Sequence, residues 1–164
     1  LKDIMHSLID GSASTLTGDV SLRDRENVTL QSFDSRPNDP VTARFSHEDP
    51  AAAAELTNYV DGLSASGSTA MYQTLLEALR ETDPAGGIPS IVLLSDGQDT
   101  VGPRFSKFKE EYEQLPAAQR SVPVFVILYG DASESEMREL AELTGGEVFD
   151  ALGGDLAPLR GVAA

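Results

Sequence analysis

The sequence contains no cysteine and little positive charge. Without cysteine, the chain can form neither disulfide bonds nor thiolate metal sites. Its 12 lysines and arginines are outnumbered by 27 aspartates and glutamates, which gives a formal net charge of -15 and a pI near 4.3. This balance argues against binding to nucleic acid or to an anionic membrane surface. No apolar run approaches the ~20 residues that a membrane-spanning helix needs, so we expect no membrane span in this chain.

The 164 residues that are present suffice for one domain with a sizeable core. The chain does not begin with Met and carries no signal peptide, so we expect it to be a piece of a longer protein. The absence of cysteine also fits an extracellular or cell-envelope location, with a cytoplasmic location as the alternative.

One stretch organises the rest of the chain. Ile91–Leu94 is an apolar run without alternation that ends at once in Ser95, Asp96 and Gly97. Such a run is typical of a strand buried on both faces of a parallel sheet. An acidic residue therefore follows the carboxyl end of this strand, where open α/β sheets bind their ligands. Val124–Leu128 is a second all-apolar run, and we expect the two strands to be interior neighbours.

Strand and helix patterns alternate along the sequence, which predicts an α/β fold with a doubly wound, mostly parallel sheet and one antiparallel edge strand. The predicted helices are Leu1–Ile9, Ala51–Val60, a helix that starts after Thr69, Phe105–Leu115, Ser133–Leu143 and a final turn within Leu156–Val162. The predicted strands are Val28–Phe33, Val41–Phe45, Ile91–Leu94, Val124–Leu128 and Glu147–Phe149, the first two close enough to pair as a hairpin.

Three helix starts carry local capping signals. Asp49 precedes Pro50, the usual order of an N-cap residue and a proline in the first turn. Ser133 and Glu136 have the spacing of a capping box. Thr69 stands where the N-cap of the next helix is expected, and Asp96 can likewise be read as a turn residue.

Two motifs in this frame resemble the von Willebrand factor type A domain. The Gly-Ser-Thr-Ala-Met-Tyr segment 67–72 is similar to the family's Gly-x-Thr loop, and Asp96-Gly97 after the apolar strand is similar to its Asp-Gly strand end. Residues 140–149 match the family's closing helix and edge strand. The resemblance covers nearly the whole chain in the expected order, and it implies a single Rossmann-like type A domain over residues 1–164.

The resemblance also implies a metal-ion-dependent adhesion site. In such a site, oxygen ligands hold Mg²⁺, with Mn²⁺ or Ca²⁺ as alternatives, and leave one position for the carboxylate of a partner. Carried over to this sequence, Thr69 would supply a hydroxyl oxygen, and Asp96 would coordinate the ion directly or through water. Ser68, Gly97 and Asp131 would border the site.

The sequence departs from the family at the Asp-x-Ser-x-Ser motif, which should end the first, central strand. The matching string Asp10-Gly11-Ser12-Ala13-Ser14 follows a helix pattern, and the interval to Val28 is too short for a helical crossover. We therefore expect the central strand and its motif to precede Leu1, so that the domain is N-terminally incomplete. Asp10, Ser12 and Ser14 should not be metal ligands, and metal binding by this chain should be weak or absent.

The implied function is a binding module, not an enzyme, that captures a carboxylate of a protein or other ligand through a divalent cation. Segments 122–131 and 149–155 resemble bacterial cell-envelope proteins that fuse a solute-binding domain to a type A domain. One alternative is an intracellular adaptor for an ATPase that inserts metals or remodels proteins. Another is a metal-dependent α/β hydrolase that uses Asp96, with Asp99 as a second carboxylate.

Overall fold

The structure, a computed structural model, describes residues 2–12, 21–64, 68–95, 98–129 and 134–150. These residues form two compact units. The hairpin unit consists of the described residues of 1–32 and 38–66, and the sheet unit consists of those of 33–37 and 67–152. The predicted α/β class is confirmed, because a parallel three-stranded sheet occurs together with an antiparallel pair of strands.

The hairpin unit contains α1 (Lys2–Asp10), β1 (Asn27–Leu30), β2 (Val41–Arg44) and α2 (Pro50–Gly62). The two strands pair antiparallel, as predicted, with Val28 opposite Ala43. Both strands are shorter than the sequence suggests. Pro37 and Pro40 lie between them and cannot donate hydrogen bonds to a ladder, so β1 stops at Leu30, opposite Val41, while β2 ends at Arg44, one residue before its predicted end.

The core of the hairpin unit is small and largely aliphatic. Its buried side chains are Ile9, Ala43, Phe45, Ala52, Leu56 and Val60. The start of α2 confirms the local capping signal, because the Asp49 carboxylate accepts the Ala51 backbone N–H at 2.9 Å and Pro50 occupies the first turn.

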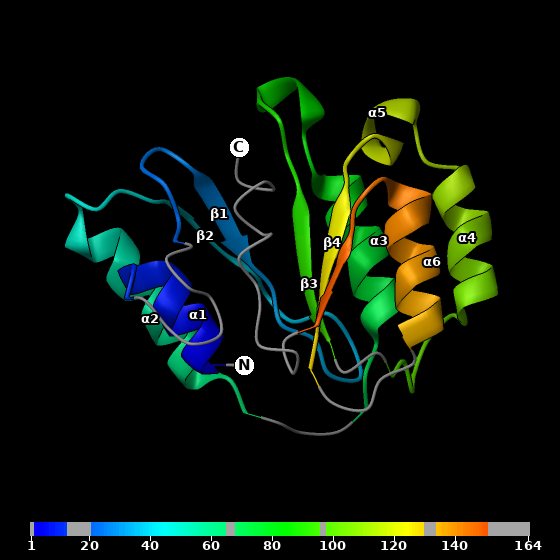
Figure 1. The fold of residues 1–164 in the computed structure, drawn as a ribbon, viewed down its shortest axis with the longest axis horizontal. Helices are drawn as coiled ribbons and strands as arrows, with labels where there is room; N and C mark the ends of the chain where they lie inside the picture. Colours follow the sequence, from blue (N-terminus) through cyan, green and yellow to red (C-terminus); the bar gives the residue numbers. More distant parts are fainter. Residues whose placement is uncertain (1, 13–20, 65–67, 96–97, 130–133, 151–164) are drawn as a thin grey trace. The chain divides into compact units, whose positions relative to one another are not determined.

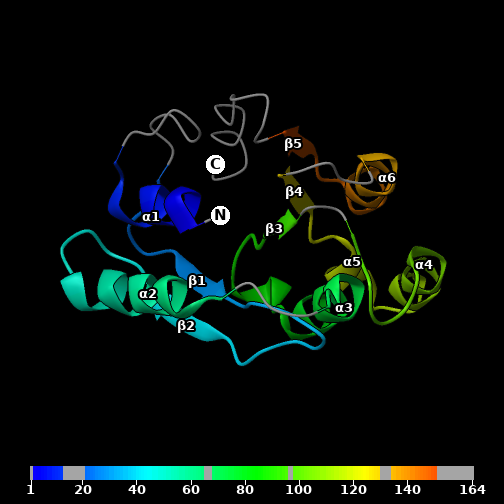
Figure 2. The same ribbon diagram turned by 90° about the horizontal axis from the view of Figure 1, so that it is seen from below.

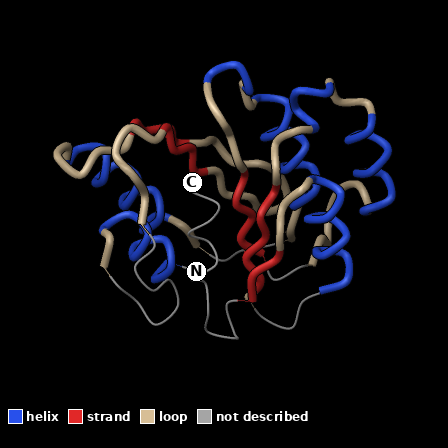
Figure 3. The backbone as a smooth tube through the Cα atoms, turned by 45° about the horizontal axis from the view of Figure 1, so that its top comes forward, coloured by secondary structure: helices blue, strands red, loops and turns tan. Residues whose placement is uncertain are grey.

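The sheet unit alternates helices and strands along the chain (Figure 3). Its elements are α3 (Met71–Glu81), the 3₁₀ helix η1 (Pro84–Gly86), β3 (Ile91–Ser95), α4 (Phe105–Glu113), α5 (Ala117–Arg120), β4 (Val124–Leu128), α6 (Glu134–Thr144) and β5 (Val148–Asp150). All three strands are parallel, in the order β3-β4-β5. The helices α3, α4 and α6 run antiparallel to the strands. Each helix therefore begins at the end of the sheet toward which the strand arrowheads point (Figure 1).

The position of β3 corrects one expectation. β4 has a strand on each side, but β3 pairs with β4 alone among the described residues and forms an edge of this sheet. The prediction of two interior neighbours is therefore right for β4 and for the pairing itself, and wrong for the interior place of β3. The described chain supplies no strand on the other side of β3, and its Val92 side chain is 42% exposed.

The core of the sheet unit lies between the sheet and the helices α3, α4 and α6, which all cover one face (Figure 2). Alternate strand residues point into it, among them Leu93, Val124 and Val126. Across α3 and α4 runs an aromatic row of Tyr72, Phe105, Phe108 and Tyr112, whose successive ring centroids lie 5.4 to 6.1 Å apart.

Several helix ends differ from the sequence expectation. The helix predicted over Phe105–Leu115 ends at Glu113, and the four-residue α5 that follows Pro116 was not predicted. The Ser133 cap and the turn predicted within Leu156–Val162 lie outside the described residues. No helix in the described ranges is long and apolar enough to cross a membrane.

Candidate functional site

The residues predicted for the metal site divide into two groups. Ser68 and Thr69 belong to the described part of the sheet unit, in the segment just before α3. Asp96, Gly97 and Asp131 lie outside the described residues, so the structure gives the positions of the chain on either side of them.

The strands bring the two acidic segments to one edge of the sheet. Ser95 is the last residue of β3, is buried, and accepts the Tyr129 backbone N–H at its carbonyl oxygen over 3.1 Å. Ser95 is also in register with Leu128, the last residue of β4. The chain therefore enters the segments of Asp96 and Asp131 from adjacent points at the carboxyl edge of the sheet.

The backbone of Thr69 is bound to the loop that follows β3. The carbonyl oxygen of Thr69 accepts the backbone N–H groups of Thr100 and Val101, each at 3.0 Å. In return, the Thr69 N–H donates to the Thr100 hydroxyl at 2.7 Å. The next residue, Ala70, donates its N–H to the Asp34 carbonyl oxygen at 2.6 Å. Both backbone groups of Thr69 are thus occupied, and the segment before α3 is held against the loop after β3.

The expectation that Thr69 caps α3 is wrong. The N-cap position is taken by Ala70, and no side chain at that position bonds to the helix. Instead, the Asp99 carboxylate reaches the first turn of α3 and accepts the Tyr72 N–H over 3.4 Å. The Thr69 hydroxyl forms no hydrogen bond with another described residue, so its oxygen is not used in capping.

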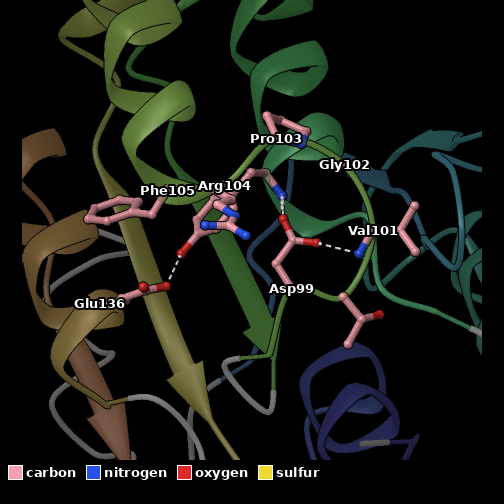
Figure 4. A pocket seen from close by; sticks show the side chains of 9 residues that line it. Asp99, Val101, Gly102, Pro103, Arg104, Phe105 and Glu136 are labelled. Atoms are coloured by element: carbon pink, nitrogen blue, oxygen red, sulfur yellow. Dashed lines mark hydrogen bonds between the residues drawn. The ribbon is translucent and has the colours of Figure 1, made fainter.

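Asp99 lies at a pocket of about 390 Å³ that is lined by Tyr72, Glu136 and residues 99–105 (Figure 4). Its second carboxylate oxygen accepts the Val101 N–H at 3.3 Å. The Glu136 carboxylate accepts the Tyr72 hydroxyl at 2.9 Å. Burial is the main cause that raises the pKa of Asp99, the Glu136 charge adds to it, and the backbone N–H bonds oppose it. Burial likewise raises the pKa of the Tyr72 hydroxyl.

The described residues alone do not form a complete metal site. No group of three histidine, aspartate or glutamate side chains among them is placed to hold an ion. Thr69 does fit the role of the hydroxyl ligand in the expected set. Its hydroxyl oxygen forms no hydrogen bond with another described residue, and threonine hydroxyls ligate Mg²⁺ in other oxygen-rich sites.

Asp10 lies in a different setting from a strand-end metal ligand. It is the last residue of α1, in the hairpin unit, and its carboxylate accepts the Ser12 N–H at 2.7 Å. Hydrogen bonds from Ser12 lower the pKa of Asp10. This local turn accounts for the Asp-Gly-Ser string, while Ser14 lies outside the described residues.

Thr100 was missed by the sequence reading. It belongs to no motif, and its pairing with Thr69 joins positions 31 residues apart. A local pattern carries no signal for such a contact.

Comparisons with known proteins agree with the observed α/β fold. A family profile described as von Willebrand factor type A domain matches residues 14–149. A von Willebrand factor type A structure from Catenulispora acidiphila gives a TM-score of 0.65 at 21% identity, over 91% of this chain and 33% of that chain. This chain thus spans about a third of the length of that protein. No curated protein matches the sequence.

Two further structures are similar in fold. The conserved hypothetical protein BatB from Bacteroides thetaiotaomicron gives a TM-score of 0.61 at 15% identity, over 99% of this chain and 82% of that chain. Proximal thread matrix protein 1 from the mussel byssus was solved with a zinc-occupied MIDAS motif. It gives a TM-score of 0.51 at 17% identity, over 99% of this chain and 40% of that chain. At these identities the likeness concerns the fold alone.

Proposed function

Because this chain belongs to the von Willebrand factor type A family, we propose that it is a binding module that captures a carboxylate of a protein or ligand through a divalent cation. The observation that carries the proposal is the anchoring of Thr69. Its backbone is bonded to the loop that follows β3, while its hydroxyl oxygen forms no hydrogen bond with another described residue. A ligand oxygen held by its backbone and otherwise unused suits a metal site.

In this proposal, Thr69 and Asp96 hold the ion, which is Mg²⁺ or, in its place, Mn²⁺ or Ca²⁺. Ser68, Gly97 and Asp131 form the border of the site. When bound, the ion supplies a positive centre with a free coordination position for a carboxylate. In this proposal, residues 1–164 belong to one type A domain.

The net charge supports a role for the cation. A chain with a formal net charge of -15 repels carboxylate ligands at long range. Capture of a carboxylate by such a chain therefore depends on a local positive charge, which the bound cation would supply. The same charge disfavours nucleic acid as a partner. We place the protein at the cell envelope or outside the cell, in keeping with the resemblance of segments 122–131 and 149–155 to bacterial cell-envelope proteins.

The arrangement around Asp99 favours a binding module over a hydrolase. Both carboxylate oxygens of Asp99 accept backbone N–H groups, one from Tyr72 in α3 and one from Val101. This carboxylate therefore serves to join two segments of the backbone. A hydrolase with Asp96 and Asp99 as paired catalytic carboxylates would need Asp99 directed at a substrate instead.

Titration calorimetry with Mg²⁺ and Mn²⁺ tests the proposal on the full-length protein. We expect binding by the unmodified protein, no measurable binding by Asp96→Ala, and weaker binding by Thr69→Val. The matched control is Asp83→Ala, because Asp83 caps η1 before the amino end of β3, away from its carboxyl edge. Affinity in Asp96→Ala equal to that of the unmodified protein would remove Asp96 from the site.

A further inference from the structure

We propose that Thr100 is a positioning residue for the metal site: its hydroxyl fixes the backbone of Thr69 and so sets the place of the Thr69 hydroxyl. This inference rests on the proposed function of Thr69 as a metal ligand. Thr100 itself touches neither the ion nor the partner in this account.

The contact between the two threonines is reciprocal. The Thr69 N–H donates to the Thr100 hydroxyl at 2.7 Å, and the Thr100 N–H donates to the Thr69 carbonyl oxygen at 3.0 Å. Two bonds in opposite directions between the same pair of residues restrain both the distance and the orientation of the Thr69 peptide groups. Rotation of either peptide plane away from this arrangement breaks one of them.

Thr100 supplies the only side chain among the described residues that bonds to the Thr69 backbone. The other bonds to the Thr69 backbone come from the backbone N–H groups of Thr100 and Val101, and the Ala70 N–H donates to the Asp34 carbonyl oxygen. The nearest further side-chain contact is made one residue later, where the Thr74 hydroxyl donates to the Ala70 carbonyl oxygen at 2.8 Å at the start of α3. Among the described residues, the Thr100 hydroxyl is therefore the one side-chain contact to the Thr69 backbone itself that a substitution can remove.

The position of Thr69 is sensitive to this contact because no helix cap restrains it. Ala70 occupies the N-cap position of α3 without a side-chain bond, and Thr69 lies outside the helix. Mg²⁺ demands near-octahedral oxygens at ~2.0–2.1 Å, so a small shift of a ligand oxygen weakens binding. Groups that orient a ligand from outside the coordination sphere typically change metal affinity by about 10–100-fold when they are removed.

The Thr69–Thr100 bond is exposed to solvent, which separates positioning from general stability. In Thr100→Val, water replaces the hydroxyl as partner of the Thr69 N–H, so the stability of the fold should change little. Water does not restrain the direction of the peptide as a side chain fixed to the opposite loop does. We therefore expect the loss to appear in metal affinity and in local exchange rather than in the unfolding transition.

The test compares Thr100→Val, Thr100→Ser and the control Thr42→Val in the full-length protein. Thr42 shares a hydroxyl contact of 2.8 Å with Thr29 in the hairpin unit, so its variant loses a similar exposed bond elsewhere. By Mg²⁺ calorimetry, we expect Thr100→Val to lose about tenfold in affinity. Thr100→Ser keeps the hydroxyl and should restore the affinity, and Thr42→Val should leave it unchanged.

Amide hydrogen exchange without metal provides the second readout. The Thr69 amide should exchange faster in Thr100→Val and at the normal rate in Thr100→Ser. Normal affinity or normal exchange at Thr69 in Thr100→Val overturns the positioning role. A failure of the proposed function gives a different result. In that case the unmodified protein binds no Mg²⁺, or Asp96→Ala binds Mg²⁺ with the same affinity as the unmodified protein. The exchange rates then decide the role of Thr100 in holding the loop, independently of the metal.

Discussion

The two units of the molecule differ in how their cores are built. The sheet unit buries an aromatic row in which Phe108 is fully enclosed and stacks between Phe105 and Tyr112. The core of the hairpin unit has one buried aromatic residue, Phe45, among alanine and aliphatic side chains. Its two strands are four residues long and need the packing of helices to be stable.

This difference bears on where a binding site can be supported. Ligand oxygens must be held within fractions of an ångström, which requires a rigid surrounding. Thr69 and Thr100 belong to the unit with the large core, next to the helix that contributes Tyr72 to the aromatic row. Thr69 and Thr100 thus lie in the unit with the larger cluster of buried apolar side chains among the described residues.

Truncation of the two core phenylalanines should have the largest effects. Phe108 and Phe45 are both buried, so Phe108→Ala and Phe45→Ala should each cost ~3–5 kcal/mol in the free energy of unfolding. Urea unfolding followed by circular dichroism measures the loss. Amide exchange should then accelerate first in α3 and α4 for Phe108→Ala, and in β2 and α2 for Phe45→Ala.

The same exchange pattern in both phenylalanine variants would contradict the comparison, because it would mean that the two cores do not stabilise separate parts of the chain. Phe108→Leu serves as the control, since it retains most of the apolar volume and should cost less than Phe108→Ala.

Removal of the α2 cap should have a smaller effect. Asp49 bonds to the Ala51 N–H, so Asp49→Ala should cost ~1 kcal/mol, while Asp49→Asn retains an acceptor oxygen and should cost less. Thermal unfolding of the three proteins checks this order. An equal loss in Asp49→Asn and Asp49→Ala would show that the charge of Asp49, and not its hydrogen bond, stabilises the helix start.

Much of the fold could be predicted because its signals are local. Val124–Leu128 was located to the residue from its apolar run, and Asp49-Pro50 marked the start of α2. The hairpin was recognised from two short strands around a proline-containing turn. The four-residue α5 was missed because one turn of helix shows no periodicity.

The candidate site was harder to predict because it depends on contacts between distant residues. Thr69 has the chemistry of an N-cap, yet the carboxylate that accepts an N–H in the first turn of α3 comes from Asp99, 27 residues after its partner Tyr72. The same loop contributes Thr100, whose hydroxyl no motif would single out. The placement of Thr69 and Asp96 around one ion stays a prediction.

The hydroxyl of Tyr72 offers a finer probe of the sheet unit. Tyr72→Phe keeps the buried ring and removes the bond to Glu136, so it should cost ~0.5–1 kcal/mol. The loss lies at the low end because Glu136 is exposed and can bond to water instead. Denaturant unfolding of Tyr72→Phe and of the control Tyr59→Phe, in the hairpin unit, measures it. A loss above ~3 kcal/mol would show that the ring itself is displaced.

The smallest effects are expected from two carboxylates whose pKa values are shifted in opposite directions in the two units. Burial raises the pKa of Asp99 above its ordinary 3.8, while hydrogen bonds from His47 lower the pKa of Asp24 below that value. The His47 backbone N–H and ring nitrogen lie 2.6 and 3.0 Å from one oxygen of Asp24. The stability that each carboxyl contributes should therefore change with pH in opposite senses.

For Asp99, the folded state retains a proton that the unfolded chain has already lost above pH 3.8, so its contribution to stability declines as the pH rises through that window. For Asp24, the unfolded chain binds a proton first as the pH falls, so the contribution of Asp24 to stability declines as the pH falls below 3.8.

Subtracting the unfolding free energy of Asp99→Asn from that of the unmodified protein should give a difference that falls with rising pH. The same subtraction for Asp24→Asn should give a difference that falls with decreasing pH. Urea unfolding from pH 3 to pH 6 measures both, because the other carboxylates cancel in each subtraction. If the two free-energy differences changed with pH in the same direction, the environments of Asp99 and Asp24 would be alike. That result would contradict the contrast between the two units.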